Sequence, residues 1–472
     1  MGTINSAFGT ISSALDADQA ALSIVANNVA NASTPGYTRE VPNWHENAPV
    51  EINSASYGTG VTETGPTSVR DRVLQERLVQ QEQLASASGS RLTALNSLQA
   101  LFTPDSGSSG STAGDIGSDI TNFFDSFSSL ANSGTPTNNA LRQQVLSTAS
   151  TLAGDISNAA AGLNSQRSAL DQESAGITSQ VNALTGAIAQ LNQQIQSGSP
   201  SGDAGTLEDQ RQQDISQLSQ LIGINQVPTE NNGLSITTTS GQLLVSEATS
   251  FQMTNGLKGG VTDFFVGGAD VTSSLTGGGG QLGGLLTARD QDIPTALTAL
   301  DQIAYGISTA VNAQNDSGAD LSGDTSNAGN IFDAPTVVAG SAGAMKVVMT
   351  DPNHIAAAAT GAGTGDNSNA LAMANLATGL IVNGQTPTNY YSQFVSNLGS
   401  MVSEVQTDNT AQTASVTQLQ TQVQSLSGVN LNDEASSMQQ LENSYQAASQ
   451  VFSLLNKIMT SALNLGVETA VS

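Results

Sequence analysis

The sequence predicts a mainly α fold: a discontinuous coiled-coil and helical-bundle protein in which the N- and C-terminal helices pair and a small β domain is inserted. Apolar residues recur at the alternating 3,4 spacing of a heptad at both ends of the chain and in two internal stretches. Only 11% of the 472 residues are charged, against roughly 25% in an ordinary globular domain, so the helix flanks are small or neutral. Residues 226–280 differ, because they alternate in short apolar runs as β-hairpins do.

The first 36 residues are expected to form one helix. Its heptad positions hold Ile4, Phe8, Ile11, Leu15, Leu22, Val25 and Val29. Asp18 takes the seam position between Leu15 and Leu22, where a polar group would fix the register. Pro35 and Gly36 are expected to end this helix and to start the outward connection.

The C-terminal segment carries a matching heptad. Its positions hold Met438, Leu441, Tyr445, Ala448, Phe452, Leu455, Met459 and Ala462. Because both terminal helices have Ala, Ser, Asn and Gln on their flanks rather than charges, we expect them to pair and to be buried on several sides. The alternative is a central helix pair of a globular core, but their position at the two ends of the chain argues against it.

The remaining heptads predict a helical rod. One frame runs from Val145 to Ile195, and a second from Leu398 to Leu426 is expected to be its antiparallel partner. Shorter helices are expected at residues 69–102, 205–222 and 293–313. The predicted domains are residues 1–36 with 428–472 as a terminal coiled coil, residues 37–225 with 281–427 as the rod, and residues 226–280 as the β insert.

Turn residues support the β insert. Asn232-Gly233 and Asn255-Gly256 are expected hairpin turns, and the glycines at 277–280 end the segment. Residues 335–350 are a candidate additional strand, centred on Met345–Met349.

Charge and composition exclude several classes of function. The chain has 39 acidic and 12 basic residues, a net charge of −27, so nucleic acid and anionic membranes are poor partners. With no cysteine and only two histidines, His45 and His354, it offers no disulfide, thiolate or His-rich metal site. The first positive side chain is Arg39 and no apolar run approaches 18 residues, so neither a cleaved Sec-type signal nor membrane insertion is expected.

Four short motifs suggest chemistry, and each has a simpler explanation. GGGQLG at residues 278–283 fits a nucleotide-binding fingerprint, but a glycine-rich exit from the β insert explains the glycines more simply. Asp316, Asp320 and Asp324 are spaced by four, whereas an EF-hand spaces its acids by two. Asp351 and His354 lie close together in the sequence, but the chain has no GxSxG motif that would supply a nucleophile. MGTINS fits a myristoylation pattern, but this segment belongs to the terminal heptad. We therefore expect no catalytic residue, no cofactor and no metal site, and the chain is not expected to be an enzyme.

One sequence signature follows the N-terminal heptad. The segment NNVANASTPGYTR at residues 27–39 resembles the signature shared by flagellar rod, hook and hook-associated proteins. Residues 427–465, 279–314 and 351–376 resemble blocks of the first hook-associated protein family, the proteins of the hook–filament junction. The signature residues in this chain are Asn27, Asn28, Asn31, Pro35, Gly36 and Tyr37.

The resemblance implies a structural, axial protein of the bacterial flagellum that serves motility. It implies secretion by the flagellar type III route without a cleaved signal, and an extracellular location at the hook–filament junction. The implied partners are other copies of the chain in a ring or helical assembly, the hook protein, the second hook–filament junction protein, and a cytosolic export chaperone at the C-terminal helix. The assembly interface would use the heptad residues from Ile4 to Val29, with Asp18, and from Met438 to Met459.

Two alternatives stay open on the sequence. Another flagellar axial protein, such as flagellin or the second junction protein, would share the terminal heptads. A type III secreted coiled-coil effector would share them too, although a translocator should also carry an apolar membrane-inserting stretch.

Overall fold

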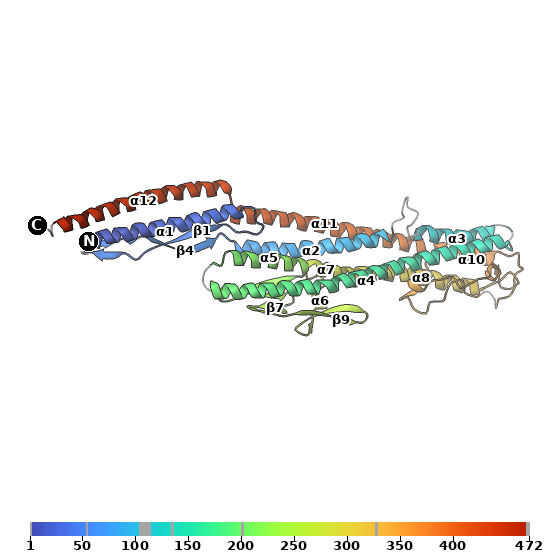
Figure 1. The fold of residues 1–472 in the computed structure, drawn as a ribbon. Helices are drawn as coiled ribbons and strands as arrows, with labels where there is room; N and C mark the ends of the chain where they lie inside the picture. Colours follow the sequence, from blue (N-terminus) through green and yellow to red (C-terminus); the bar gives the residue numbers. More distant parts are fainter. Residues whose placement is uncertain are drawn as a thin grey trace.

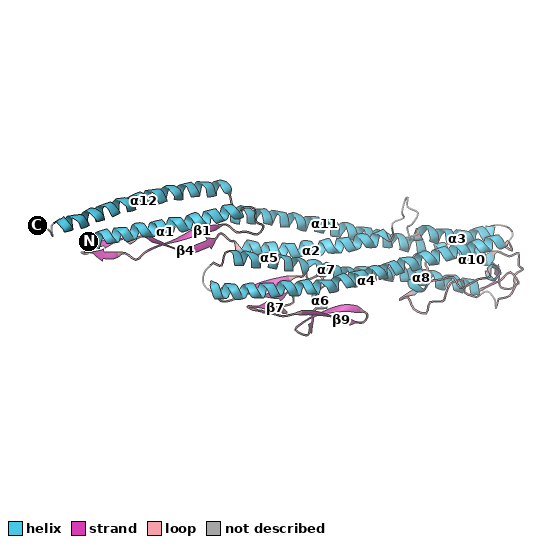
Figure 2. Ribbon diagram, in the orientation of Figure 1, coloured by secondary structure: helices cyan, strands magenta, loops and turns pink. Residues whose placement is uncertain are grey.

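The computed structural model describes residues 2–52, 55–102, 115–132, 134, 136–199, 203–325 and 329–468. The molecule is elongated, and both termini lie at the same end (Figure 1). Long helices dominate it, with small sheets beside them (Figure 2). This arrangement confirms the mainly α fold class. No helix in the described residues is both long enough and apolar enough to span a membrane.

The two terminal helices pair, as expected. Helix α1 (Gly2–Asn31) packs along α12 (Leu431–Glu468), and the pair extends beyond the helical rod (Figure 1). Helix α1 ends at Asn31, four residues before Pro35. The chain then turns with the Thr34 amide donating to the Asn31 carbonyl at 2.9 Å, and Gly36 adopts a left-handed φ of +79° that favours glycine.

A β ribbon that the sequence analysis did not predict packs on α1. Strand β1 (Glu40–Glu46) pairs antiparallel with β4 (Val61–Ser68), with a register shift between Pro42 and Trp44. Strands β2 (Val50–Ile52) and β3 (Ala55–Tyr57) extend it. The strands were missed because their residues lack a clear alternation of apolar and polar side chains.

The rod is a bundle of long helices. Its members are α2 (Arg72–Ala100), α3 (Ile116–Asn132), α4 (Asn139–Gly198), α5 (Thr206–Leu221), α8 (Ile293–Asp316) and α11 (Pro387–Ser427). The α4 heptad faces inward, since Val145, Ile156 and Val181 are fully buried. The predicted pairing of α4 with α11 is wrong, because α11 packs mainly on α2. Periodicity fixes which face of a helix is apolar, but not which other helix covers it.

The β insert forms two small sheets beside α4 (Figure 2). One has the order β5 (Ile224–Pro228), β6 (Leu234–Thr238), β7 (Leu243–Ser246), β8 (Thr249–Ser250), and the other contains β9 (Met253–Lys258), β10 (Val261–Val266) and β11 (Ala269–Asp270). Asn232 lies in the β5–β6 turn with φ +62°. The expected turn at Asn255-Gly256 is wrong: both residues lie within β9, and Gly259 and Gly260 make that turn.

The exit from the β insert brings two backbones together. After α6 (Thr272–Leu275), helix α7 (Gly280–Thr287) continues through the π-helical turn η1 (Ala288–Asp292) into α8. A Cβ on Gly280 would collide with the backbone of Ile222. Close packing of two backbones therefore accounts for a glycine in the GGGQLG segment.

The outer end of the rod consists of short elements. They are β12 (Gly318–Ala319), α9 (Ser341–Ala344), η2 (Pro352–His354), β13 (Ala358–Ala359), α10 (Ser368–Asn375) and η3 (Leu376–Thr378). The strand expected at Met345–Met349 is absent from this described segment, which has only an isolated bridge between Phe332 and Val347.

Candidate assembly interface

The buried strip of α1 is displaced from the predicted heptad over its C-terminal half. Ala17, Ala21, Ile24 and Asn28 are buried, whereas Val29 is 39% exposed. These positions keep the 3,4 spacing but lie one residue before the predicted frame. The ribbon and α12 both pack on α1, so the buried side of the helix is set by two neighbours rather than one.

The remaining predicted positions of α1 lie at the edge of this strip. Phe8, Ile11, Leu15 and Leu22 are half-buried, and Val25 is buried. Asp18 is half-buried too, and burial raises the pKa of its carboxyl. The side chain of Ile4 lies outside the described part of the structure.

The predicted heptad of α12 faces α1. Met438, Leu441, Phe452, Leu455 and Met459 are half-buried. The rings of Phe8 and Phe452 meet edge to face, with centroids 4.9 Å apart, a geometry that favours aromatic pairs. Tyr445 lies at the margin and is 39% exposed.

Helix α12 carries a second apolar strip that this chain leaves uncovered. Val451, Leu454 and Ile458 are 43%, 59% and 46% exposed. They repeat at the 3,4 spacing one position before the residues that face α1. We call Val451, Leu454 and Ile458 the outer strip. Helix α12 has α1 along one side only (Figure 1), so the outer strip is available to another molecule.

The signature residue Asn28 joins the two termini. Its side-chain nitrogen donates to the Glu40 carbonyl at 2.8 Å and to Glu434 at 3.1 Å. Its oxygen accepts from the Glu40 amide at 3.0 Å and from the Tyr37 hydroxyl at 2.9 Å. Because Asn28 is 1% exposed, these bonds form in a buried setting where they are expensive to lose.

Glu434 anchors the start of α12 against this group. It is 1% exposed, and Arg39 donates to it from Nε at 2.7 Å. The Arg39 amide also donates to the Ser427 carbonyl at the end of α11, at 2.8 Å. Sequence reasoning did not assign roles to Arg39 and Glu434. The available signal was a pair of acids, Asp433-Glu434, at the start of a helix with few charges.

The other signature residues shape the turn after α1. Asn31 donates to the Asn27 side chain at 2.7 Å and accepts from the Thr34 hydroxyl at 3.1 Å. These bonds, with the left-handed Gly36, bring Tyr37 back to Asn28. The signature residues are therefore spaced so that the turn after α1 folds back onto α1.

Acidic groups crowd the connection between the ribbon and the rod. Burial, followed by the charges of Asp203 and Asp209, raises the pKa of Glu40 against the opposing effect of Arg70. Burial and the charges of Glu40, Asp209 and Glu434 raise the pKa of Tyr37 to about 12. Tyr37 therefore stays protonated and able to donate its hydrogen bond.

Two carboxylates of the rod hold the base of the ribbon. Asp209 accepts from the Thr38 amide at 2.8 Å and from its hydroxyl at 2.6 Å. Asp203 accepts from the Ser68 amide and hydroxyl. Burial acts to raise the pKa of Asp203, but the hydrogen bonds from Gly205 and Ser68 outweigh it and lower that pKa.

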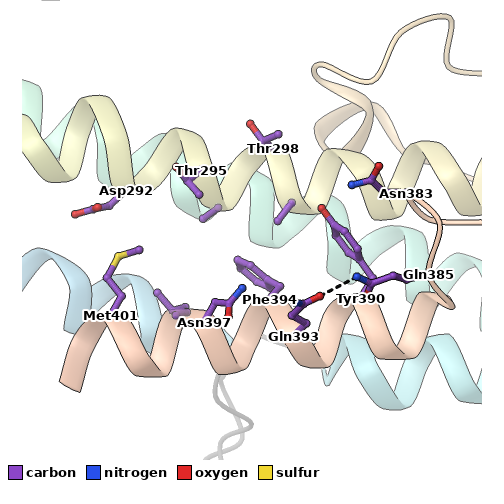
Figure 3. Close-up of a pocket in the computed structure, with 13 residues that line it drawn as sticks. Asp292, Thr295, Thr298, Asn383, Gln385, Tyr390, Gln393, Phe394, Asn397 and Met401 are labelled. Atoms are coloured by element: carbon purple, nitrogen blue, oxygen red, sulfur yellow. Dashed lines mark hydrogen bonds between the residues drawn. The ribbon is translucent and has the colours of Figure 1, made fainter. Parts of the chain in front are cut away.

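A groove lies between α8 and α11 on the rod. It has a volume of about 470 Å³ and is lined by Tyr390, Phe394, Met401 and amide or hydroxyl side chains (Figure 3). Gln385 donates to Gln393 at 2.9 Å. The one carboxylate in its lining, Asp292, is held by Arg91 through two bonds of 2.9 Å. This lining offers no nucleophile paired with a free base.

The acidic motifs of the sequence do not gather as metal ligands. Asp320 instead accepts from the Ser322 and Asp324 amides, at 2.8 and 2.9 Å. Among the described residues, no three His, Cys, Asp or Glu side chains come together as metal ligands would.

Comparisons with known proteins agree with this architecture. Residues 106–332 match the family described as the helical domain of flagellar hook-associated protein FlgK, and residues 9–38 match the flagella basal body rod protein family. The second match covers α1 from Gly9 onward and the signature turn. The first covers the part of the rod from α3 to α8 together with the β insert.

Individual relatives match along nearly the whole chain. Flagellar hook-associated protein 1 of Bacillus subtilis is 28% identical, with 96% of each chain covered. The protein of the same name from Escherichia coli is 24% identical, covering 96% of this chain and 98% of its own. The flagellar hook junction protein FlgK of Burkholderia pseudomallei has a similar fold, with a TM-score of 0.64 at 20% identity over 75% of this chain and 100% of its own.

The paired terminal helices, the signature turn and the helical rod define an axial structural protein of the bacterial flagellum. Within that class, the comparisons place the chain with the hook–filament junction proteins: residues 106–332 match the helical domain of FlgK, and flagellar hook-associated protein 1 is similar over 96% of the chain.

Proposed function

We propose that this chain is a structural subunit of the hook–filament junction, exported without a cleaved signal and assembled through α1 and α12. The outer strip of α12 is the observation that carries the proposal. Three large apolar side chains at heptad spacing are exposed on a helix whose other face is already paired. Such a strip needs a partner, since exposed contiguous apolar surface marks an interaction site.

The partner of the outer strip is another copy of the chain. A head-to-tail contact of this kind generates rings or helical filaments, which suits an axial protein. The few charges on α12, with Lys457 beside the strip, permit close packing of helices from several copies. The hook protein and the second junction protein would meet the two ends of that assembly.

Electron microscopy of a strain lacking this protein tests the proposal. Hooks should persist while filaments fail to attach. Filaments that attach normally to hooks in that strain would contradict the proposed junction role.

Substitutions in the outer strip test the assembly surface separately. Leu454→Ser with Ile458→Ser should leave the helix content of the purified subunit unchanged, because both side chains are exposed, and should prevent filament attachment. The matched control is Leu257→Ser with Leu380→Ser, which removes two side chains that are 79% and 70% exposed elsewhere. Normal filaments on the first variant would move the interface away from the outer strip.

A cytosolic export chaperone is proposed to bind α12 before assembly. Helix-in-groove binding through Tyr445, Phe452 and Leu455 would cover the apolar face of α12 that is uncovered when α1 is not paired with it. Because Phe452 packs on Phe8, such a chaperone has to displace α1. Chaperone binding and pairing of the termini are therefore mutually exclusive.

Calorimetry with the purified chaperone tests this competition. Phe452→Ser with Leu455→Ser should lower the affinity, whereas Phe8→Ala should raise it by weakening the competing α1. The outer-strip variant serves as the control within the same helix. Unchanged affinity for the Phe452 and Leu455 variant would place the chaperone site elsewhere on the chain.

A further inference from the structure

A second hollow lies where the β5–β6 turn meets the start of α2 and the first turns of α5. Its volume is about 270 Å³, and it is more enclosed than the groove between α8 and α11. Two of its lining residues, Arg70 and Arg72, directly follow strand β4, so it lies in the rod at the base of the ribbon, and it shares no residue with the outer strip. None of its residues has a role in the proposed function.

Cations gather around this cavity in a strongly acidic protein. Arg70, Arg72 and Arg211 line it, three of the 12 basic residues of the chain, against the carboxylates of Glu76 and Glu208. The Arg70 side chain is 6% exposed and Arg211 is 8% exposed. Burying two guanidinium groups is costly unless acceptors surround them.

The buried carboxylate of the cavity, Glu208, is already engaged. Glu208 accepts from Arg70, from Arg72 at 3.1 Å and from the Asn232 side chain at 2.8 Å. Arg211 donates to the Asn192 side chain at 2.8 Å and to the Asn232 carbonyl at 2.9 Å. Its contacts are thus neutral oxygens rather than a carboxylate within ion-pair distance in the described residues.

Three polar atoms of the lining residues have no partner. Arg70 Nε, Gln226 Nε2 and Thr229 Oγ1 are buried, and each lacks a hydrogen-bond partner within the part of the chain that the structure describes. Two of them are obligate donors and the third can donate. Three buried donors among the residues that line one cavity indicate that an acceptor belongs there, because buried polar groups are nearly always paired.

The electrostatics of Arg211 agree with this interpretation. Burial lowers the pKa of Arg211 to about 10; Glu208 opposes the change and the neighbouring Arg72 and Arg70 add to it. The cationic form of Arg211 therefore lacks compensation in the folded chain, and an anion beside it would supply it.

We propose that the cavity bounded by α2, α5 and the β5–β6 turn binds a small oxyanion, a phosphate or a small carboxylate. Gln226 in strand β5 and Thr229 in the β5–β6 turn donate hydrogen bonds to it, and Arg70 donates from Nε. Arg72, whose side chain is 67% exposed, covers the open side. A volume of about 270 Å³ exceeds that of several water molecules, so such an ion fits. Binding would tie the β5–β6 turn to α2 and α5.

The partnerless groups allow a test that does not damage the fold. Gln226→Met with Thr229→Val removes two donors and keeps their size, and neither donor has an internal bond to lose. The matched control is Gln242→Met with Thr249→Val, the same two exchanges at exposed positions of the same sheet. Thermal unfolding and calorimetry of the full chain would use inorganic phosphate and malonate, each compared with chloride at equal ionic strength.

In phosphate, in malonate or in both, the parent and control proteins should unfold at a higher temperature than in chloride at equal ionic strength. The reason is that a ligand that binds only the folded state stabilises it. The cavity variant should bind the same anion at least tenfold more weakly and, without anion, be no less stable than the parent. The proposal is overturned if neither anion exceeds chloride. It is also overturned if the cavity variant binds as tightly as the control, because the anion would then lie elsewhere.

Discussion

At the scale of single residues, Asn28 is the side chain on which the contact between α1, the ribbon and α12 most depends. It makes four hydrogen bonds to Glu40, Tyr37 and Glu434 and is 1% exposed. It therefore connects α1, the ribbon and α12 at one point. The signature could be found in the sequence, but its meaning depends on Glu434, which lies 406 positions away.

Asn28→Ala should loosen the start of α12. The change leaves the Glu40 backbone and one oxygen of Glu434 without their partner, and each buried unpaired group costs about 1–3 kcal/mol. Hydrogen exchange of the amides at residues 427–434 should become faster. Asn443→Ala is the control, because it makes the same exchange at an exposed position of α12. Equal exchange rates in the two variants would refute this role of Asn28.

The carboxyl of Asp119 on α3 predicts a pH dependence of stability. Burial, a hydrogen bond with Asp155, and the charges of Asp155 and Asp115 raise the pKa of Asp119 from 3.8 to about 7. Since the folded chain holds this proton more tightly than the unfolded chain, the contribution is complete below pH 3.8 and is lost as the pH rises through about 7.

Asp119→Asn should remove this pH dependence, because the amide mimics the protonated acid. The unfolding midpoint of the parent should fall as the pH rises from 3.8 to about 7, and that of the variant should fall less. Asp125→Asn on the same helix, at an exposed position, should retain the slope of the parent. Identical slopes for Asp119→Asn and the parent would show that this carboxyl is not the source.

At the scale of elements, heptad patterns predicted the faces of helices better than their partners. The α12 frame faces α1 as expected, because α12 has a single neighbour. The buried strip of α1 lies one position away from its predicted frame, because the ribbon covers a second side. A ribbon formed by residues 40–68 gives no helical period, so sequence reasoning could not place that second neighbour.

The pairing of α2 with α11 illustrates the same limit. Leu95 is fully buried against Val402 and Val405, yet nothing in the spacing of α11 distinguishes α2 from α4 as its partner. Leu95→Ala should destabilise the chain by about 2–5 kcal/mol through the cavity it leaves. Leu84→Ala, on the same helix but 47% exposed, should change stability by no more than about 0.5 kcal/mol. Urea denaturation measures both, and similar losses would contradict the packing of α11 on α2.

At the scale of the whole molecule, the rod and the terminal helix pair differ in how much of their apolar surface is buried within the chain. The rod has a continuous core that joins α3, α4 and α8 to the β insert. The terminal pair buries less apolar surface. Helix α12 packs on α1, and most side chains of α12 stay exposed or half-buried. The sequence indicated this difference through two nearly uncharged heptads at the chain ends. It could not indicate the anion cavity, which arises only when α2, α5 and a β turn meet.

Because the terminal pair buries less apolar surface than the rod, we expect the free subunit to unfold first at α12. Segments with few buried contacts unfold locally at low cost, and Lys457 is the only basic residue after Lys346. Trypsin should therefore cut at Lys457 much faster in free subunits than in assembled junctions, where neighbouring copies cover the outer strip. Lys346 serves as an internal reference in the same digest, because its side chain is 67% exposed at the outer end of the rod and pairs with Asp333. Its cleavage rate should be similar in both states. If the ratio of cleavage at Lys457 to cleavage at Lys346 is the same in free and assembled protein, assembly does not stabilise the terminal helices, and the outer strip is not the surface that covers them.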